Sequence, residues 1–252
     1  MPATAVPIFA FLGLAIGSFL NVVAWRVPRG ESVVTPGSRC PACGVPLKFR
    51  DNIPVLSWLL LGRRCRSCRA RISARYPLIE AATAALYVAA GIALWEDWRE
   101  LALSVVLITF LIPITAIDLD VKRIPNALTA PAALLAVPIA AVTGPSFIPE
   151  QLIAGAAATL FFLLPALIAK KGMGMGDVKL AGVLGLYLGA PVAVAIMVAL
   201  ASGVLISAVI VMRTGVTAGR KTAIPFGPFL ALGAVVSIFA GTAILDAYLG
   251  SF

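Results

Sequence analysis

The sequence contains no histidine among its 252 residues. This absence excludes Ser-His and Cys-His catalysis, histidine-bound metals and imidazole bases, so acid-base chemistry near neutral pH must come from carboxylates, lysine, tyrosine or cysteine. Charged residues are also scarce, at 12%, whereas 61% of the chain is hydrophobic and the mean hydropathy is +1.02. This composition differs strongly from that of a soluble domain and predicts a polytopic membrane protein.

Long apolar runs follow one another along most of the chain. They lie near 6–23, 77–95, 101–117, 127–143, 151–169, 178–190, 191–212 and 225–249. We therefore expect an all-α polytopic membrane protein of about eight transmembrane helices, with a small cytoplasmic zinc-binding domain between the first two. The run at 178–190 is too short to cross a hydrocarbon core of about 30 Å unaided, so it either begins within the membrane or is re-entrant.

Basic residues fix the predicted orientation. The first apolar run is followed, not preceded, by Arg26 and Arg29, which favours a first span with its N-terminus outside over a cleaved signal peptide. With the N-terminus outside, the connections at 26–75, 118–126, 170–179 and 213–223 are cytoplasmic and hold every lysine and arginine except Arg99. The net charge of +9 is thus explained by the positive-inside rule rather than by nucleic acid binding.

All four cysteines lie in the polar segment 26–75, as the pairs Cys40-x-x-Cys43 and Cys65-x-x-Cys68. Two such turns offer four thiolates, which is typical of a structural zinc site. The alternatives are two disulfides, which a cytoplasmic location disfavours, or free thiols. Because this segment has little apolar content, a metal would supply folding energy that a hydrophobic core cannot.

Two carboxylates stand where apolar runs end. Asp177 closes the stretch Gly172-Met173-Gly174-Met175-Gly176-Asp177, and Asp118 begins Asp118-Leu119-Asp120 before a short basic turn. An aspartate at the membrane edge is costly unless it faces a cavity or a partner, and two that meet can divide acid and base roles between them. Glycines 174 and 176 permit close backbone approach and leave Asp177 near the N-terminus of the next helix. The alternative is a helix-capping Asp177, with Asp118 and Asp120 as solvated loop charges.

Polar residues also occur near the start of the chain. Asn21, with Gly17 and Ser18, marks either a polar site or helix packing, and packing is favoured for the glycine and serine. Glu80 lies just inside the second span, where it either pairs with an arginine or belongs to a second active site.

Taken together, these motifs resemble the bacterial type IV prepilin peptidases, which are GxGD-type intramembrane aspartic proteases. The resemblance rests on Gly17-Ser18-Phe19-Leu20-Asn21 with Arg26 and Pro28, the two cysteine pairs, Asn52-Ile53-Pro54, Arg75-Tyr76-Pro77 with Glu80, Asp118-Leu119-Asp120 with Pro125-Asn126, Gly174-Met175-Gly176-Asp177 with Lys179, and Ile224-Pro225-Phe226-Gly227-Pro228. Asn126 departs from the aspartate that many relatives carry there.

The resemblance implies a bifunctional enzyme of the bacterial inner membrane. Asp118 and Asp177 would be its catalytic pair, supported by Gly174, Gly176 and Lys179. It would remove the basic leader of type IV prepilins and pseudopilins after a glycine, with no cofactor, and N-methylate the new terminus from S-adenosylmethionine. Its domains would be a first helix at 1–25, a four-cysteine zinc domain at 26–75 associated with methylation, and a protease domain at 76–252. Glu80 is the residue we associate with the methyl donor.

Two other classes of function fit some of the same residues. In an ion-coupled transporter, intramembrane aspartates would bind a cation or proton between interrupted spans. Both aspartates lie toward one face, however, and no inverted repeat is visible. A non-catalytic membrane scaffold with a zinc module for a partner is the third possibility.

Overall fold

The computed structural model describes residues 4–168, 174–215 and 224–250. Over these ranges the chain is helical, and its β-structure is limited to two isolated bridges. Among the described residues, seven helices are long and apolar enough to cross a membrane. The all-α, multi-pass fold class is therefore confirmed. The chain divides into two compact units, Met1–Glu96 and Asp97–Phe252.

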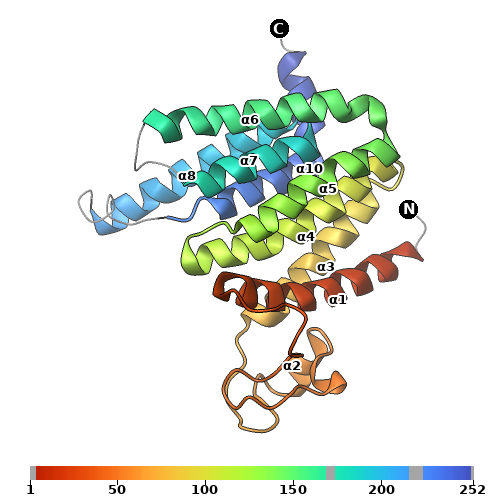
Figure 1. Ribbon diagram of the computed structural model, residues 1–252, viewed down its shortest axis with the longest axis vertical. Coiled ribbons are helices and arrows are strands. Elements are labelled where there is room, and N and C mark those ends of the chain that lie inside the picture. Colours follow the sequence, from red (N-terminus) through yellow and green to blue (C-terminus); the bar gives the residue numbers. More distant parts are fainter. Residues whose placement is uncertain (1–3, 169–173, 216–223, 251–252) are drawn as a thin grey trace. The chain divides into compact units, whose positions relative to one another are not determined.

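The first unit is built on two helices, α1 (Ala5–Arg26) and α3 (Arg75–Ala93), which pack along one another (Figure 1). Glycines make this approach possible: a Cβ added to Gly13 would lie 2.5 Å from the Cα of Ala84, and one added to Gly17 would lie 2.8 Å from the Cα of Glu80. The spacing Gly13-xxx-Gly17 is the small-residue pattern of close membrane helix pairs. The packing role expected for Gly17 is confirmed.

The polar segment between these helices, residues 27–74, is called the cysteine module below. Its regular structure among the described residues is limited to two single 3-10 turns and one short helix: η1 (Val27–Arg29), η2 (Phe49–Asp51) and α2 (Leu56–Leu60). Both ends of the module continue directly into α1 and α3, the two candidate membrane spans of this unit.

The described residues of the second unit form six helices and a 3-10 turn. They are α4 (Trp98–Val121), α5 (Asn126–Thr143), η3 (Pro145–Phe147), α6 (Ile148–Ile168), α7 (Met175–Leu188), α8 (Val192–Thr214) and α10 (Gly227–Leu249). Helix α7 is the shortest, with 14 residues, yet most of its side chains are buried against α4, α5, α6, α8 and α10. At about 1.5 Å per residue it spans only about 21 Å, less than the hydrocarbon thickness. The segment expected to be short is thus a central helix enclosed by longer ones.

Helix α4 extends further than the sequence indicated. We expected it to end near residue 117, with Asp118 in the cytoplasmic connection, but it continues to Val121. Lys122 ends it in the left-handed conformation at φ 52°, where its N–H donates to the carbonyl of Asp118 at 2.9 Å. Asp118 therefore belongs to the last turn of a rigid helix instead of a loop.

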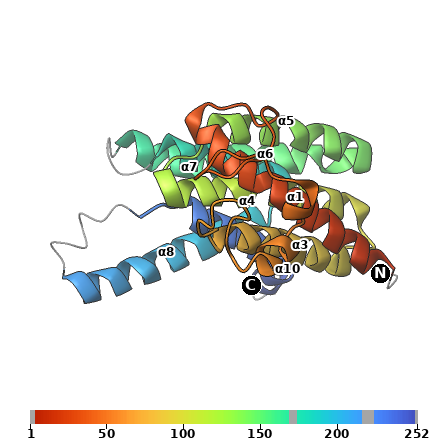
Figure 2. The same cartoon turned by 90° about the horizontal axis from the view of Figure 1, so that it is seen from below.

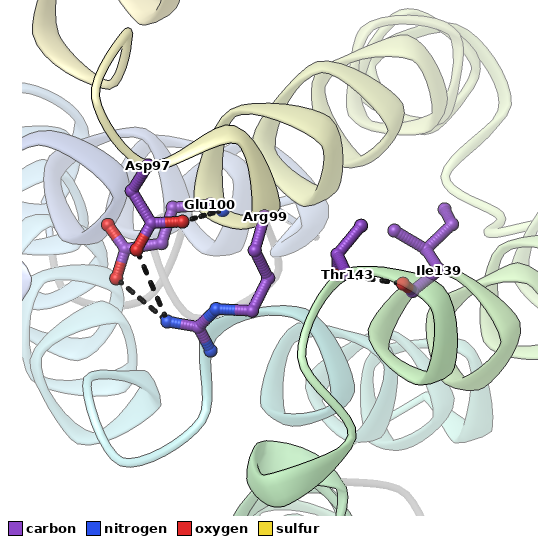
Figure 3. Close-up of polar contacts among 5 residues, drawn as sticks. All are labelled: Asp97, Arg99, Glu100, Ile139 and Thr143. Carbon is purple, nitrogen blue, oxygen red and sulfur yellow. Dashed lines mark hydrogen bonds and ion pairs between the residues drawn. The ribbon is translucent and has the colours of Figure 1, made fainter.

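The opposite end of α4 carries a compact ionic cluster (Figure 3). The Asp97 carboxylate accepts the backbone N–H of Glu100 at 2.9 Å and caps the helix. Arg99 lies 3.7 Å from Asp97 and 3.4 Å from Glu100, and its guanidinium stacks 3.6 Å from the ring centre of Phe147. This is the one basic residue predicted outside, and its charge has two acidic partners.

Candidate active site and metal site

Asp118 is held in a buried position by the start of another helix. Its side chain is in the last turn of α4, and the residue is 4% exposed. Its Oδ2 accepts the backbone N–H of Gly227, the first residue of α10, at 2.9 Å. A Cβ at Gly227 would lie 2.7 Å from that same oxygen, so only glycine permits this contact without a shift.

Asp177 lies in the first turn of α7 and is half-buried, as the glycine spacing predicted. Its N–H donates to the carbonyl of Gly174 at 3.0 Å. The turn that follows Asp118 packs against this point, because a Cβ at Gly176 would lie 2.9 Å from the Cβ of Ile124. Gly172 and Met173 of the same motif lie outside the described residues.

Lys179 adds a second contact between α7 and the segment that follows Asp118. Its Nζ donates to Oδ1 of Asn126, the first residue of α5, at 2.9 Å. The position that departs from the common pattern therefore still has a polar partner on α7.

The two carboxylates act on each other electrostatically. Burial and the nearby charge of Asp118 raise the pKa of Asp177, which lies outside the seven membrane-crossing helices, to about 6. The structure thus brings together the two aspartates that the sequence singled out, whereas Asp120 is exposed. A coupled pair of this kind can hold one proton between its members near neutral pH.

Sequence analysis did not identify Gly227 as a site residue. It lies 109 positions from Asp118, and only a hydrogen bond between the two elements shows that it belongs here. The signal available was the run Pro225-Phe226-Gly227-Pro228, because two prolines around one glycine mark an interrupted helix start.

The four cysteines form a cluster that could bind a metal. Their sulfur atoms all lie within 4.8 Å of one another, and none of the four is in a disulfide. The Sγ atoms of Cys40 and Cys68 are 3.9 Å apart. With Zn–S bonds of about 2.3 Å, the edge of a tetrahedron is about 3.8 Å, so this separation fits four-thiolate coordination.

The two cysteine pairs sit in matching turns. The N–H of Cys40 donates to the carbonyl of Val45 at 3.0 Å, and the N–H of Cys65 donates to the carbonyl of Ala70 at 2.8 Å. Backbone N–H groups of Cys68 and Ser67 lower the pKa of Cys65 to about 6. A thiolate is the form that a metal binds, so the residues present suit a soft divalent ion such as zinc.

Glu80 is buried between α1, α3 and the cysteine module. It is 7% exposed, and its Oε2 accepts the N–H of Val55 at 2.7 Å. The Ser18 side chain also hydrogen-bonds to it. The side-chain amide of Asn21 donates to the carbonyls of Gly17 and Tyr76, at 3.3 and 3.1 Å.

Fold and sites together define a multi-pass helical membrane protein with coupled aspartates and a four-cysteine cluster. Residues 11–94 match the bacterial peptidase A24 N-terminal domain, and residues 105–216 match the type IV leader peptidase family. These two matches lie within the two compact units. No solved structure matches the chain.

Relatives align over nearly the whole chain. A prepilin leader peptidase/N-methyltransferase of Neisseria gonorrhoeae is 39% identical, over 90% of this chain and 87% of the relative. A type 4 prepilin-like proteins leader peptide-processing enzyme of Escherichia coli O78:H11 is 36% identical, over 93% of this chain and 94% of the relative. A prepilin leader peptidase/N-methyltransferase of Aeromonas hydrophila is 34% identical, over 97% and 93%. The chain belongs to the type IV leader peptidase family.

Proposed function

We propose that the protein is an intramembrane aspartic endopeptidase that removes the basic leader of type IV prepilins and pseudopilins after a glycine. The observation that carries this proposal is geometric: Asp118 is buried against the N–H of Gly227, and the turn that follows it packs on Gly176, next to Asp177. Both residues are positioned by backbone contacts that tolerate only small residues, at Gly227 and Gly176. Such pre-organisation is what acid-base catalysis by two carboxylates requires.

In the proposed mechanism one aspartate is ionised and takes a proton from water as the water attacks the scissile carbonyl. The other, protonated, donates to the carbonyl oxygen and then passes its proton to the leaving amine. The two titrate as a pair, so the roles belong to the dyad and not to a single residue. The N–H of Gly227 would keep Asp118 oriented throughout the cycle.

A groove beside the dyad is suited to the apolar helix of the substrate. Its volume is about 520 Å³, and its lining from α8 and α10 includes Gly203, Ser207, Phe226 and Phe229. The second half of α8 extends beyond the other helices of its unit (Figure 2), and Val204 on it is 67% exposed. The lining residue Phe226 directly precedes Gly227, whose N–H donates to Asp118. A pilin precursor seated there would place its leader junction near the carboxylates.

Photo-crosslinking tests this seat. A photoreactive residue at Val204 in an Asp118→Asn background should cross-link to an added prepilin, whereas the same group at Leu134, a 74% exposed residue of α5, should not. Equal labelling from both positions would contradict a seat in the groove while leaving the proteolytic assignment intact.

The predicted orientation places the N-terminus outside and the cysteine module and both aspartates on the cytoplasmic side of the inner membrane. Its support is the basic-residue distribution, since the module holds 11 of the 20 lysines and arginines when Arg26 and Arg75 are included. A prepilin leader is itself basic, so attraction to this face cannot be the source of recognition. Helix packing and the acidic pair must outweigh the repulsion.

N-methylation of the new terminus is the second proposed activity, with S-adenosylmethionine as donor and zinc bound by Cys40, Cys43, Cys65 and Cys68. Bound zinc would supply the cross-link that folds the cysteine module. Glu80 remains the residue predicted to bind the methyl donor, although one of its oxygens already accepts a hydrogen bond from the N–H of Val55.

One assay addresses both activities. Purified protein in lipid is incubated with a prepilin and a labelled methyl donor, and leader loss and label are read by mass. Asp118→Asn and Asp177→Asn should each lower cleavage by about 10³-fold or more, because each removes one member of the dyad. Asp120→Asn should retain substantial activity. Full cleavage by either dyad variant would refute the assignment.

A transporter that uses the same aspartates predicts a different outcome. Its purified form would move a cation or proton across vesicles and leave the prepilin intact.

A further inference from the structure

One part of the cysteine module is strongly apolar and exposed. Residues 53–61 read Ile-Pro-Val-Leu-Ser-Trp-Leu-Leu-Leu, with no charge, and are flanked by Arg50 and Asp51 before and by Arg63 and Arg64 after. This run contains α2. Leu56, Leu59 and Leu60 are 57%, 56% and 83% exposed. A soluble module of this size would normally bury such a run or break it with charge.

Hydrogen bonds show how deep this run lies along the two membrane helices. The Asn21 side chain donates to the carbonyl of Tyr76, and Gly17 packs on Glu80, which fixes the register of α1 against α3. Glu80 is about 8 Å from the start of α3, at 1.5 Å per residue. By the same measure Ser18, which also bonds Glu80, is about 12 Å from the end of α1. Val55 donates to Glu80, so the start of α2 is held beside the first turns of α3 instead of being free of the helix pair.

The backbone at this point is strained and held in place. Val55 has φ 60° and ψ −50°, and the N–H of Leu56 donates to the carbonyl of Pro54 at 2.6 Å. This is a γ-turn of the rare, strained hand, with a β-branched residue at its centre. Strain of this kind persists only where neighbouring contacts enforce it. Here the contact is the buried carboxylate of Glu80.

Polar groups around α2 are satisfied within the module, as lipid contact demands. The Ser57 hydroxyl donates to the carbonyl of Ile53 at 2.7 Å, and the Trp58 indole N–H donates to Ile72 at 3.1 Å. The Arg63 guanidinium lies 5.0 Å from the ring centre of Trp58. Tryptophan beside arginine is typical of the membrane interface, where arginine also meets anionic headgroups.

We propose that residues 53–61 are an interfacial membrane anchor. The leucines of α2 enter the acyl boundary of an anionic bilayer, Arg63 and Arg64 contact its headgroups, and Glu80 positions the segment through Val55. The module would thereby be fixed to the membrane surface by a third point in addition to α1 and α3. This inference is independent of the proposed proteolysis.

Trp58 is a built-in reporter of this contact. In a full-length variant with Trp25, Trp95 and Trp98 replaced by Phe, in nanodiscs with anionic lipid, Trp58 fluorescence should be quenched by bromine near the headgroup end of the acyl chains. Quenching should fall by about twofold or more in Leu59→Ser/Leu60→Ser, because the apolar contact is lost. Val34→Ser, at a 78% exposed position elsewhere in the module, should leave it unchanged.

Glu80 variants separate positioning from charge. Glu80→Gln keeps an acceptor for Val55 and should retain the quenching, whereas Glu80→Ala should lose it. Bound metal serves as the folding control for each variant. Equal quenching in Glu80→Ala with metal retained would remove Glu80 from the proposal.

The wild-type protein provides a second measurement that needs no variant. A photoreactive group carried near the headgroup end of an acyl chain should label the peptide that contains residues 53–61. An unlabelled peptide, or Trp58 insensitive to bromine, would show that protein or water covers these leucines and would overturn the proposal.

Discussion

The cysteine module and the aspartate site are held together by different physical means. The module has little regular structure and carries positive φ at three non-glycine residues, Val55, Arg63 and Arg69. The aspartate site is formed by the ends of helices whose close contacts depend on Gly176 and Gly227. We propose that a bound metal stabilises the first region, whereas tight helix packing holds the second.

From this difference we expect the two proposed activities to be lost separately. Changes at the metal should act on the module, and changes at packed glycines should act on the dyad.

Of the changes outside the two aspartates, metal removal should have the largest effect. Replacing the exposed Cys43 and Cys68 by Ser leaves too few ligands for a tetrahedral site, and structural zinc contributes on the order of 10 kcal/mol to small domains. We expect about one equivalent of zinc in the wild type, none in the variant, and loss of methyl transfer by more than about tenfold. Metal analysis and the combined mass assay measure both.

The separation itself is tested by cleavage in the same variant. Leader removal should stay within about threefold of wild type, because the dyad uses no group of the module. A parallel collapse of cleavage would show that the two units depend on each other for folding.

Gly227→Ala should have the next largest effect. Its methyl group would lie 2.7 Å from Oδ2 of Asp118, so the carboxylate must move and its hydrogen bond to the N–H is lost. We expect kcat/KM for cleavage to fall about 10- to 100-fold, the cost of misplacing a catalytic group. Gly37→Ala, where no atom lies within 4 Å of the added Cβ, is the control and should match wild type. An unaffected Gly227→Ala would mean that Asp118 is not held in this way.

The sequence indicated the cysteine cluster and the helix start at Asp177 better than the contacts that support them. Spacing alone indicated the four cysteines and the start of the helix at Asp177, because each depends on neighbours in the chain. It could not show that α4 continues through Asp118, since Lys122 ends that helix in a left-handed conformation that propensity disfavours. Nor could it show the contact of Glu80 with Val55, which depends on how the module folds back along α3.

The pH profile of cleavage tests the electrostatic coupling. The pKa of Asp177 is raised to about 6, so its protonated form is present below that pH and is depleted as pH rises through it. Because one member of the dyad must carry a proton, kcat/KM should fall by up to about tenfold per pH unit on the alkaline side of a midpoint near 6. Asp120→Asn should keep the same midpoint. A midpoint near 4, the ordinary aspartate value, would show that neither burial nor the charge of Asp118 raises the pKa of Asp177.

Arg69→Gly should stabilise the module by about 1 kcal/mol, because Arg69 has φ 61° and glycine adopts that conformation without penalty. The corresponding position of the first cysteine turn is already Gly44, at φ 70°. The reciprocal Gly44→Ala should destabilise by a similar amount. Zinc release against a competing chelator measures both, and the two variants should change the stability of the module in opposite directions. A change in the same direction would mean that the two cysteine turns are not equivalent.

Asn126→Asp should have the smallest effect. It tests how a contact beside the aspartate site contributes to stability and to cleavage. The contact with Lys179 is exposed, so converting it to an ion pair adds only about 0.2–1 kcal/mol, and an acid at the start of α5 is also favourable to the helix. The added negative charge near Asp177 should move the alkaline midpoint of cleavage slightly upward, because it opposes ionisation of the dyad. Both effects should shrink in high salt, and the part of the stability gain that comes from the ion pair should be lost when Lys179 is also changed to Met. A gain that survives Lys179→Met in full would come from the helix start alone, and Asn126 would then contribute nothing through its partner on α7.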